Sequence, residues 1–255
     1  MPIGDQTMLE NYKKHVAERA KQNIPPLPLD ADQTSELIKL LKEDHKESDF
    51  LLDLLKERVP AGVDQAAYVK AAFLADITTG KASSPYITKI DAVKILGTML
   101  GGYNIQPLIE CLKDNELAET AAHVLSRTLL IFDAFNEIFE LSKTNEHAKK
   151  VVEEWANATW FTEKTDIEEQ IKLTVYKVTG EINTDDLSPA PDAWSRPDIP
   201  LHALAMFKMP RTGLDDPLGT IEKLKEKGNP LVFVGDVVGT GSSRKSATNS
   251  VLWHM

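Results

Sequence analysis

The sequence predicts a multidomain protein in which an N-terminal α-helical array is followed by an α/β domain. Up to residue 161, short amphipathic segments follow one another, and each is bounded by proline, glycine or a capping residue. A polar, acidic stretch over 162–169 then precedes the first strand-like alternation, at 171–178. We therefore expect a helical domain over 1–161, a linker over 162–169 and a second domain over 170–255. The order strand, helix, strand, helix in that second domain is typical of an α/β or β/β/α layer domain.

Length, composition and charge narrow the class of protein. A chain of 255 residues can form two hydrophobic cores, so that neither a disulfide nor a metal is needed for folding. Its 42% hydrophobic and 27% charged residues are typical of a soluble globular protein. The net charge of −10 disfavours non-specific attraction to nucleic acid or anionic membranes, although a local basic patch is compatible with it. No long apolar run and no N-terminal signal segment is present, so we expect a cytoplasmic protein with no membrane partner.

The helical segments are predicted from their apolar periodicity and their end signals. Residues 8–22 form the first predicted helix, and Asp30 and Asp32 can cap the second, whose apolar face reaches Leu41. The other predicted helical segments cover residues 48–59, 64–77, 88–100, 105–112, 117–132, 134–141 and 145–155. Short paired helices must stack on their neighbours to bury their apolar stripes, as they do in an α-solenoid. Because no strict sequence repeat is present, periodicity supports a helical array and no particular repeat family.

The stretch over residues 231–255 has the features of an anion-binding turn. Leu231–Gly235 suits a buried strand, and a glycine-rich turn follows in which Ser242 stands where a helix N-cap would stand. Free N–H groups at the start of that helix, two hydroxyls and the guanidinium of Arg244 would then converge, which favours a carboxylate or a phosphate. The spacing matches neither GxxxxGK(S/T) nor GxGxxG, so a strand-to-helix turn without a ligand is an equal alternative.

A proline-rich stretch over residues 183–200 is the second unusual feature. Prolines at positions 189, 191, 197 and 200 predict a stiff, extended path without a helix. Such a path can hold polar groups in place, although a solvated crossover is the alternative for this stretch on its own. The polar residues on it are Asp185, Asp186, Ser188, Asp192 and Arg196. Beyond it, residues 201–207 suit a short helix or a strand, and residues 221–227 a helix that ends at Gly228.

The two stretches together closely resemble the swivelling domain of the bacterial aconitase B family. The resemblance rests on TGEINTDDLSPAPDAWSRPDIPLHALAM over 179–206 and on GDVVGTGSSRKSATNSVLW over 235–253. Upstream, LLDLLKERVPAGVDQAAYVKAAFL over 51–74 and LGTMLGGYNIQPLIECL over 96–112 resemble the N-terminal HEAT-like domain of that family. The resemblance covers essentially the whole chain. It implies a HEAT-like α-helical array followed by a β/β/α swivelling domain that is incomplete at its C-terminus.

The resemblance implies an iron–sulfur hydro-lyase of the tricarboxylic acid cycle. Such an enzyme interconverts citrate, cis-aconitate and isocitrate and also dehydrates 2-methylisocitrate. The reaction takes a proton from carbon and expels a hydroxyl, so it needs cations for the substrate carboxylates, a base and a Lewis acid. By resemblance Ser242 is the base, and Ser243 contacts the substrate. The substrate-binding residues that the resemblance implies are Arg196, Ser242, Ser243, Arg244 and Asp185, with the adjacent Asp186 as the alternative to Asp185.

The single cysteine limits what this chain can do alone. Aconitases hold a 4Fe–4S cluster through three cysteine thiolates, whereas this chain has only Cys111, which we expect to be a small buried apolar residue. We therefore expect no metal ligands in this chain, cluster ligands elsewhere in a longer protein, and no activity of the chain alone. The chain also looks truncated, because it ends at Met255 inside the predicted helix that follows Ser242.

A non-enzymatic hypothesis comes from the same resemblance. HEAT-like arrays present surfaces to partners, and the family resembles proteins whose cluster-free form binds messenger RNA and whose helical domain forms a homodimer. The alternative is therefore an interaction or regulatory module without catalysis of its own. The acidic balance of the chain argues weakly against RNA binding by this part alone.

Overall fold

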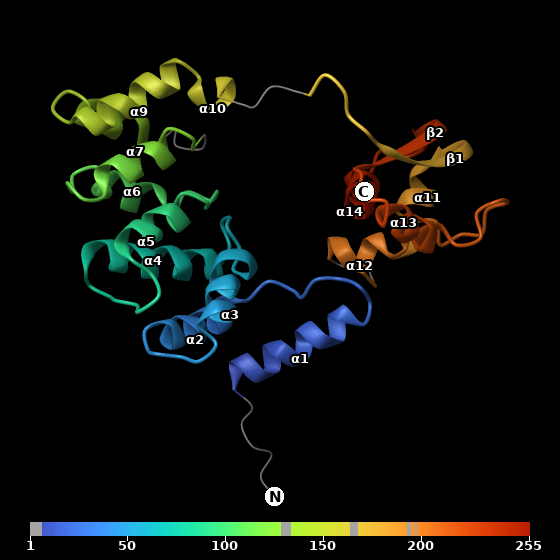
Figure 1. The fold of residues 1–255 in the computed structure, drawn as a ribbon, viewed down its shortest axis with the longest axis horizontal. Coiled ribbons are helices and arrows are strands. Elements are labelled where there is room, and N and C mark those ends of the chain that lie inside the picture. Colours follow the sequence, from blue (N-terminus) through green and yellow to red (C-terminus); the bar gives the residue numbers. More distant parts are fainter. Residues whose placement is uncertain (1–6, 129–133, 164–167, 193–194, 197) are drawn as a thin grey trace, which may run out of the picture. The chain divides into compact units, whose positions relative to one another are not determined.

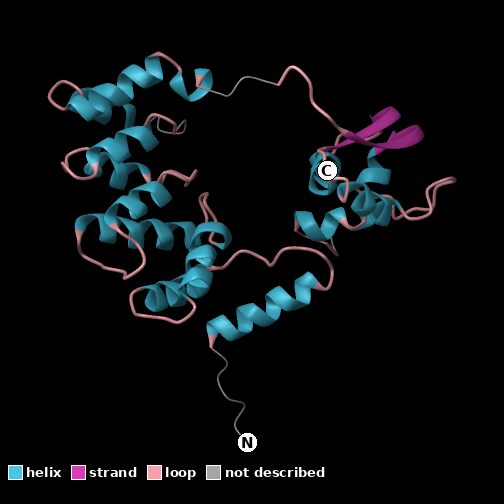
Figure 2. Ribbon diagram, viewed as in Figure 1, coloured by secondary structure: helices cyan, strands magenta, loops and turns pink. Residues whose placement is uncertain are grey.

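The computed structural model describes residues 7–128, 134–163, 168–192, 195–196 and 198–255, and the chain divides into two compact units. Unit 1 comprises Met1–Glu18 and Pro26–Thr165, and unit 2 comprises Arg19–Pro25 and Asp166–Met255. Each unit has its own hydrophobic core. Figure 2 shows that the structure is mostly helical, with two strands in unit 2. A helical part followed by a small α/β part is confirmed.

Unit 1 is a stack of short helices, which Figure 1 shows lying side by side along the chain from blue to yellow. Helix α7 packs against both α5 and α9, so that each helix buries its apolar stripe on its neighbours. The helices are α1 (Met8–Ala20), α2 (Ala31–Leu41), α3 (Ser48–Asp53), α4 (Gln65–Thr79), α5 (Lys89–Leu96), α6 (Ile105–Cys111), α7 (Ala118–Leu125), α8 (Phe135–Leu141), α9 (Glu146–Ala156) and α10 (Thr159–Thr162). A π-helical turn, Leu54–Arg58, extends α3.

Side-chain caps fix several of these helix ends. Asp30 accepts from the Gln33 N–H in a capping box at the start of α2, whereas Asp32 lies inside the first turn. Asp64 caps α4, whose C-terminal end is closed by Gly80 at φ 76°, a left-handed conformation that favours glycine. Asn145 accepts from the Ala148 N–H at the start of α9.

Two predicted helices are shorter in the structure. The helix predicted over 88–100 ends at Leu96, because the Asn104 amide donates to the Leu96 and Met99 carbonyls at 2.8 and 3.1 Å and so replaces the next helical turn. The helix predicted over 117–132 ends at Leu125, and its last part, 129–132, lies outside the described residues.

Cys111 is buried in the core of unit 1, as predicted, with 4% of its surface exposed. Burial raises the pKa of its thiol. None of the helices in the described ranges is both long and apolar enough to cross a membrane.

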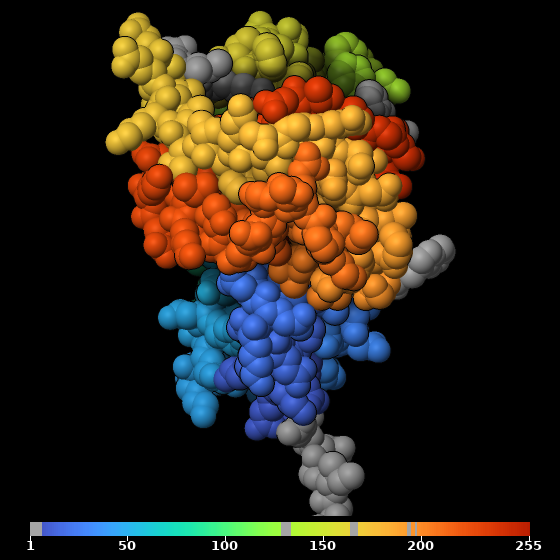
Figure 3. Space-filling model, turned by 90° about the vertical axis from the view of Figure 1, so that its right-hand side faces the viewer, coloured from blue at the N-terminus to red at the C-terminus, as the bar shows by residue number. Residues whose placement is uncertain are grey.

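Unit 2 is built on two parallel strands, β1 (Thr174–Asn183) and β2 (Leu231–Thr240). The strands pair from Thr174 opposite Leu231 to Asn183 opposite Thr240. Its helices are α11 (Thr184–Leu187), α12 (Ile199–Ala203), α13 (Pro217–Lys225) and α14 (Lys245–His254), with a 3₁₀ turn at Ala190–Asp192. In the space-filling view of Figure 3, the C-terminal part of unit 2 faces the viewer, coloured from yellow to red. Its core includes Tyr176 and Phe207, and the ring of each lies about 6 Å from the ring of the partly buried Phe233.

The first predicted strand is confirmed in part, because a strand is present but its bounds differ. β1 begins three residues later than the predicted segment 171–178 and continues to Asn183. It buries the face of Thr174, Tyr176 and Val178, whereas Val175 on the other face is 53% exposed. Since both faces carry apolar residues, alternation alone did not show which face packs on the aromatic core.

The proline-rich stretch is not an extended path, so that prediction was wrong. It folds as the short helices α11 and α12 with the 3₁₀ turn between them. Pro200 lies in the first turn of α12, where no N–H is needed, and Asp198 caps that helix. Pro197 lies outside the described residues. Of the two alternatives for 201–207, the helical one is confirmed in part, since α12 ends at Ala203.

The glycine-rich turn was also predicted too early. β2 continues past Gly235 to Thr240, because β1 supplies a pairing partner along its whole length. A Cβ atom at Gly235 would lie 2.6 Å from Ile182 Cδ1, so this glycine permits close packing, and the positive φ angles belong to Gly239 and Gly241.

Two helix starts in unit 2 also differ from their predictions. The N-cap of α14 is Arg244, which makes no side-chain capping bond, so the N-cap role predicted for Ser242 was wrong. Helix α13 begins at Pro217 and not at residue 221, since Asp216 caps it.

Candidate active site

The carboxyl ends of the two strands bring the predicted site segments together. β1 leads into α11, whereas β2 leads through residues 241–243 into α14. The Thr184 hydroxyl donates to the Ser242 carbonyl at 2.8 Å and joins the two segments. In open α/β sheets, ligands bind outside the carboxyl ends of the strands, where the helix N-termini point. The site is therefore at the edge where such a fold binds a ligand.

The start of α11 separates the roles of two adjacent aspartates. Asn183 caps the helix by accepting from the N–H groups of Asp185 and Asp186. The Asp186 carboxylate accepts from the Asn183 N–H at 2.9 Å and from Arg211 Nη1 at 3.3 Å. The Asp185 carboxylate, in contrast, bonds the guanidinium of Arg244. It is thus Asp185, not Asp186, that contacts the glycine-rich segment.

Arg244 is held by two acceptors from the segment that follows β1. Its Nη1 atom donates to Asp185 Oδ1 and, at 3.0 Å, to the Ser188 carbonyl. The Arg244 hydrogen bond, with help from the Ala190 N–H, lowers the pKa of the Asp185 carboxyl. Ser242 and Ser243 are both exposed, and in the chain they directly precede Arg244 and α14. Exposed hydroxyls, an anchored guanidinium and an uncapped helix N-terminus can bind a carboxylate or a phosphate.

A cavity of about 610 Å³ lies along β2 and α14. Its polar lining residues include Thr184, Ser243 and Arg244, and its apolar walls include Phe233 and Val251. A volume of this size is within the range of small-molecule sites. The structure therefore brings Ser243 and Arg244 to one cavity and ties Asp185 to it through the ion pair with Arg244.

Arg196 lies elsewhere in unit 2. Its Nε atom is 3.3 Å from Asp192 Oδ1, and its Nη1 atom donates to the Leu201 carbonyl at 3.1 Å. Asp192 is buried, and hydrogen bonding from Lys208 is the main cause that lowers its pKa. Arg196 lines a separate cavity of about 160 Å³. The structure therefore does not bring Arg196 and Arg244 into one cavity.

A hydrogen-bond chain that sequence analysis missed lies between α11, α12 and α14. The Ser188 hydroxyl is 2.7 Å from His202 Nε2 and donates to the Ser246 hydroxyl at 2.7 Å. Ser188 is buried, and its carbonyl is an acceptor for Arg244. The proline-rich stretch indicated Ser188 as a polar residue, but no spacing in the sequence indicates that His202 and Ser246 meet it.

The residues present do not fit an iron–sulfur cluster. Cys111 is buried in unit 1 with a raised thiol pKa, whereas a cluster ligand must be a thiolate that reaches the iron. In the part of the chain that the structure describes, no three His, Cys, Asp or Glu side chains are grouped so that they could hold a metal ion.

The chain thus combines a helical unit with a second unit in which an anchored guanidinium and two exposed hydroxyls lie at the carboxyl ends of the strands. Residues 11–161 match the family model described as Aconitate B N-terminal domain, and residues 173–255 match the model described as Aconitate hydratase 2 N-terminus. The chain belongs to the aconitate hydratase B family.

Similar proteins carry the name of an enzyme. Aconitate hydratase B of Escherichia coli (strain K12) is 60% identical over 257 residues, which cover 97% of this chain and 30% of that protein. The proteins of the same name from Pseudomonas aeruginosa and Helicobacter pylori are 59% and 50% identical, and each match covers 96% of this chain and 29% of the relative. The chain thus spans about 30% of the length of the curated relatives that it matches.

Proposed function

We propose that this chain supplies substrate-carboxylate binding and a serine base to a hydro-lyase that interconverts citrate, cis-aconitate and isocitrate and dehydrates 2-methylisocitrate. The observation that supports this most strongly is the anchored Arg244 beside Ser242 and Ser243 at the carboxyl end of β2. Tricarboxylates carry the negative charge that such a site attracts. The family's name, aconitate hydratase B, specifies the substrate class.

Arg244 is the proposed carboxylate clamp. Within the described residues its Nη1 atom alone is engaged, by Asp185 and the Ser188 carbonyl, so that Nη2 and Nε remain for a substrate carboxylate. A guanidinium held at one nitrogen presents the others in a fixed plane, which lysine cannot reproduce. Asp185 therefore orients the clamp in this proposal.

Ser242 is the proposed base, and Ser243 the proposed hydroxyl donor to the substrate. A serine removes a proton from carbon only as an alkoxide, which positive charge must stabilise. The N-terminal end of α14, a ten-residue helix, and the adjacent Arg244 supply that charge. Arg196, which Asp192 orients, lines a separate cavity in this structure, so it is not part of the clamp that we propose for Arg244.

The family also implies a 4Fe–4S cluster in the longer protein. We place its ligands outside this chain, because the donor set described above does not fit, and we expect this chain alone to be inactive. The activity is therefore tested on the longer protein, reconstituted with iron and sulfide without oxygen. We expect Ser242→Ala to lower kcat with little change in KM, and Ser243→Ala to raise KM. An unchanged kcat in Ser242→Ala would contradict the proposed base.

Substrate binding is tested on this chain by calorimetry with citrate. We expect Arg244→Lys to raise the Kd for citrate about tenfold or more, since a bidentate charged contact is lost. Arg58→Lys, which makes the same change in unit 1, is the control and should leave the Kd unchanged. Equal affinity of Arg244→Lys and the unaltered chain, with both folded by circular dichroism, would contradict the proposal.

Self-association through unit 1 is a second candidate function, supported by an exposed apolar patch on two adjoining loops. Val63 and Leu100 are 76% and 68% exposed. The loops are joined by the Tyr103 hydroxyl, which donates to the Val63 carbonyl at 3.1 Å, and the Tyr68 and Tyr103 rings meet edge to face. Large apolar residues that cluster on a surface are typical of protein contacts.

Sedimentation over a range of concentrations tests this candidate. If the patch joins two copies, Leu100→Asp should give a monomer at concentrations where the unaltered chain dimerises. Leu252→Asp, at a position in unit 2 that is 69% exposed, is the matched control. A dimer that persists in Leu100→Asp would reject the patch as the contact.

A further inference from the structure

A second cavity, of about 590 Å³, lies in unit 1 along α5, α7 and α9. Its polar lining residues include Lys94, Thr98, Thr120, His123, Arg127 and Lys150. These side chains lie on α5, α7 and α9 or, for Thr98 and Arg127, just after the ends of α5 and α7, and α7 packs against both of the other helices. The volume is within the range of small-molecule sites.

The floor of this cavity depends on a close approach between α5 and α7. Gly97 follows the last residue of α5, and a Cβ atom there would lie 2.6 Å from Val124 Cβ. Arg127 lies just after the end of α7, and its Nη1 atom donates to the His123 carbonyl of that helix at 3.1 Å. The cavity is thus formed by the packing of the helices and is not a gap between loose loops.

The lining is cationic in a chain of net charge −10. Lys94, Arg127 and Lys150 contribute positive charge, and Glu119 is the one carboxylate among the residues that line it. Glu154 and Glu163, which lie beside Arg127 and Lys150, offset part of this charge.

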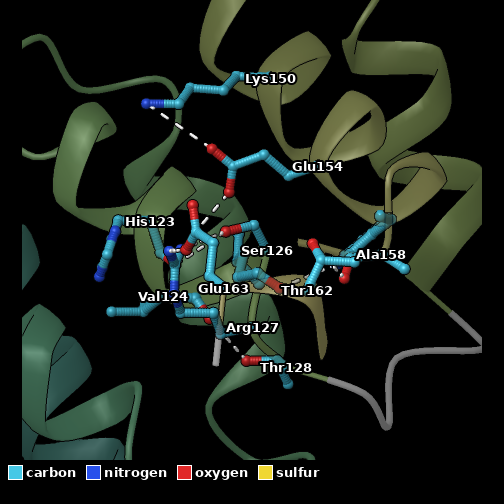
Figure 4. Close-up of polar contacts among 12 residues, drawn as sticks. His123, Val124, Ser126, Arg127, Thr128, Lys150, Glu154, Ala158, Thr162 and Glu163 are labelled. Carbon is cyan, nitrogen blue, oxygen red and sulfur yellow. Dashed lines mark hydrogen bonds and ion pairs between the residues drawn. The ribbon is translucent and has the colours of Figure 1, made fainter. Parts of the chain in front are cut away.

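Two of the cations are fixed by one carboxylate, which Figure 4 shows between them. Glu154 is 3.5 Å from Arg127 Nη1 and 3.8 Å from Lys150 Nζ. Arg127 also bonds Glu163 through Nη2. Lys94, in contrast, makes no salt bridge with any described residue, and the His123 ring lies outside the network of dashed contacts.

We propose that this cavity binds a small polyanion through its phosphate or carboxylate groups. Lys94 and Lys150 supply the charge that contacts the anion, and His123 with the hydroxyls of Thr98 and Thr120 can donate hydrogen bonds to it. Arg127 is already satisfied by Glu154 and Glu163 and acts as a positioning residue. The site lies wholly in unit 1, so it is separate from the residues proposed to bind the tricarboxylate.

The test is calorimetry of this chain with inorganic pyrophosphate as the probe. We expect saturable binding that Lys94→Gln and Lys150→Gln each weaken about tenfold or more, because each removes a charged contact. Lys89→Gln, an exposed lysine on α5 that does not line the cavity, is the matched control and should bind as before. Absence of binding, or an equal loss in Lys89→Gln, would overturn the proposal.

Further experiments distinguish binding in this cavity from anion binding elsewhere in the chain and from RNA binding. Because the Arg244 site can also take a phosphate, pyrophosphate binding is measured in Arg244→Lys as well. Lys94→Gln and Lys150→Gln should still weaken the binding that remains there about tenfold or more, so the two proposals can fail independently. Citrate that still binds to Arg244→Lys and is lost on adding Lys94→Gln would support a carboxylate occupant of this cavity. The last experiment is competition between pyrophosphate and a single-stranded RNA. If the RNA, counted per phosphate group, binds more tightly than pyrophosphate, the small-molecule assignment is overturned and an RNA ligand is favoured.

Discussion

The hydroxyl of Thr184 donates to the carbonyl of Ser242 at 2.8 Å and joins segments that are 58 residues apart in the chain. Thr184 is buried, at 5% exposure, at the start of α11. The bond holds the end of β2 against the end of β1 where the predicted site residues meet.

Thr184→Val should loosen this junction while preserving the shape of the side chain. We expect the free energy of unfolding to fall by about 1 kcal/mol, the usual net value of one hydrogen bond, and citrate binding to weaken. Urea unfolding and calorimetry measure the two effects. Thr220→Val removes an exposed hydroxyl that bonds within α13 and serves as the control. Unchanged citrate affinity in Thr184→Val would show that the junction does not position the site.

The pKa of Asp185 should depend on Arg244. The hydrogen bond from Arg244 is the main cause that lowers this pKa, so the carboxylate keeps its charge as the pH falls below the ordinary value of 3.8. In Arg244→Ala we expect the pKa to return toward that value. Carbon-detected NMR of the side-chain carboxyl during acid titration measures it. The same pKa in both proteins would mean that the ion pair is not formed in solution.

Lys70 should destabilise unit 1 at neutral pH. Its side chain is fully buried, its ammonium has no hydrogen-bond partner among the described residues, and burial lowers its pKa from 10.5 to about 8. Below about pH 8 both the native and unfolded states carry the proton, so the whole cost of burying the charge is present. Between pH 8 and 10.5 the unfolded state binds more protons, and stability rises with pH.

Lys70→Met should therefore raise the free energy of unfolding at pH 7 by about 2 to 3 kcal/mol and remove the gain above pH 8. Denaturant unfolding from pH 7 to 10 checks both effects. Lys81→Met, at an exposed position, should change neither. A loss of stability in Lys70→Met at pH 7 would show that the ammonium has a favourable partner.

Gly97→Ala should be destabilising although alanine is the better helix former. The new Cβ atom would lie 2.6 Å from Val124 Cβ, and overpacking of this kind costs about 1 to 3 kcal/mol. Thermal unfolding of Gly97→Ala, of Val124→Gly, which removes the Cβ atom from position 124, and of the double variant forms a cycle. We expect the double variant to lose less stability than the sum of the single ones, and strict additivity would contradict the close packing.

The sequence predicted local features of unit 1 well because they depend on neighbouring residues. Asp30 caps α2 as expected, since a cap needs only the adjacent turn. The end of α5 was missed, because the amide of Asn104, from the next loop, takes the Leu96 carbonyl.

In unit 2 the errors come from long-range pairing. β2 continues to Thr240 because β1 lies beside it, and Tyr176 turns inward because Phe233 is there. The resemblance indicated which residues belong to the site, but no pattern in the sequence shows that Asp185 meets Arg244 or that Arg196 lines another cavity. Such contacts are set by tertiary packing, which a single sequence does not specify.

We propose that the segment from Gly241 to Ser246 binds a tricarboxylate. The most direct measurement is a titration of the ¹⁵N-labelled chain with citrate, followed by backbone amide NMR. We expect saturable shifts for the amides of Ser242, Ser243, Arg244 and Asp185, all of which should be lost in Arg244→Lys. Shifts that spare these amides, or that persist unchanged in Arg244→Lys, would contradict it.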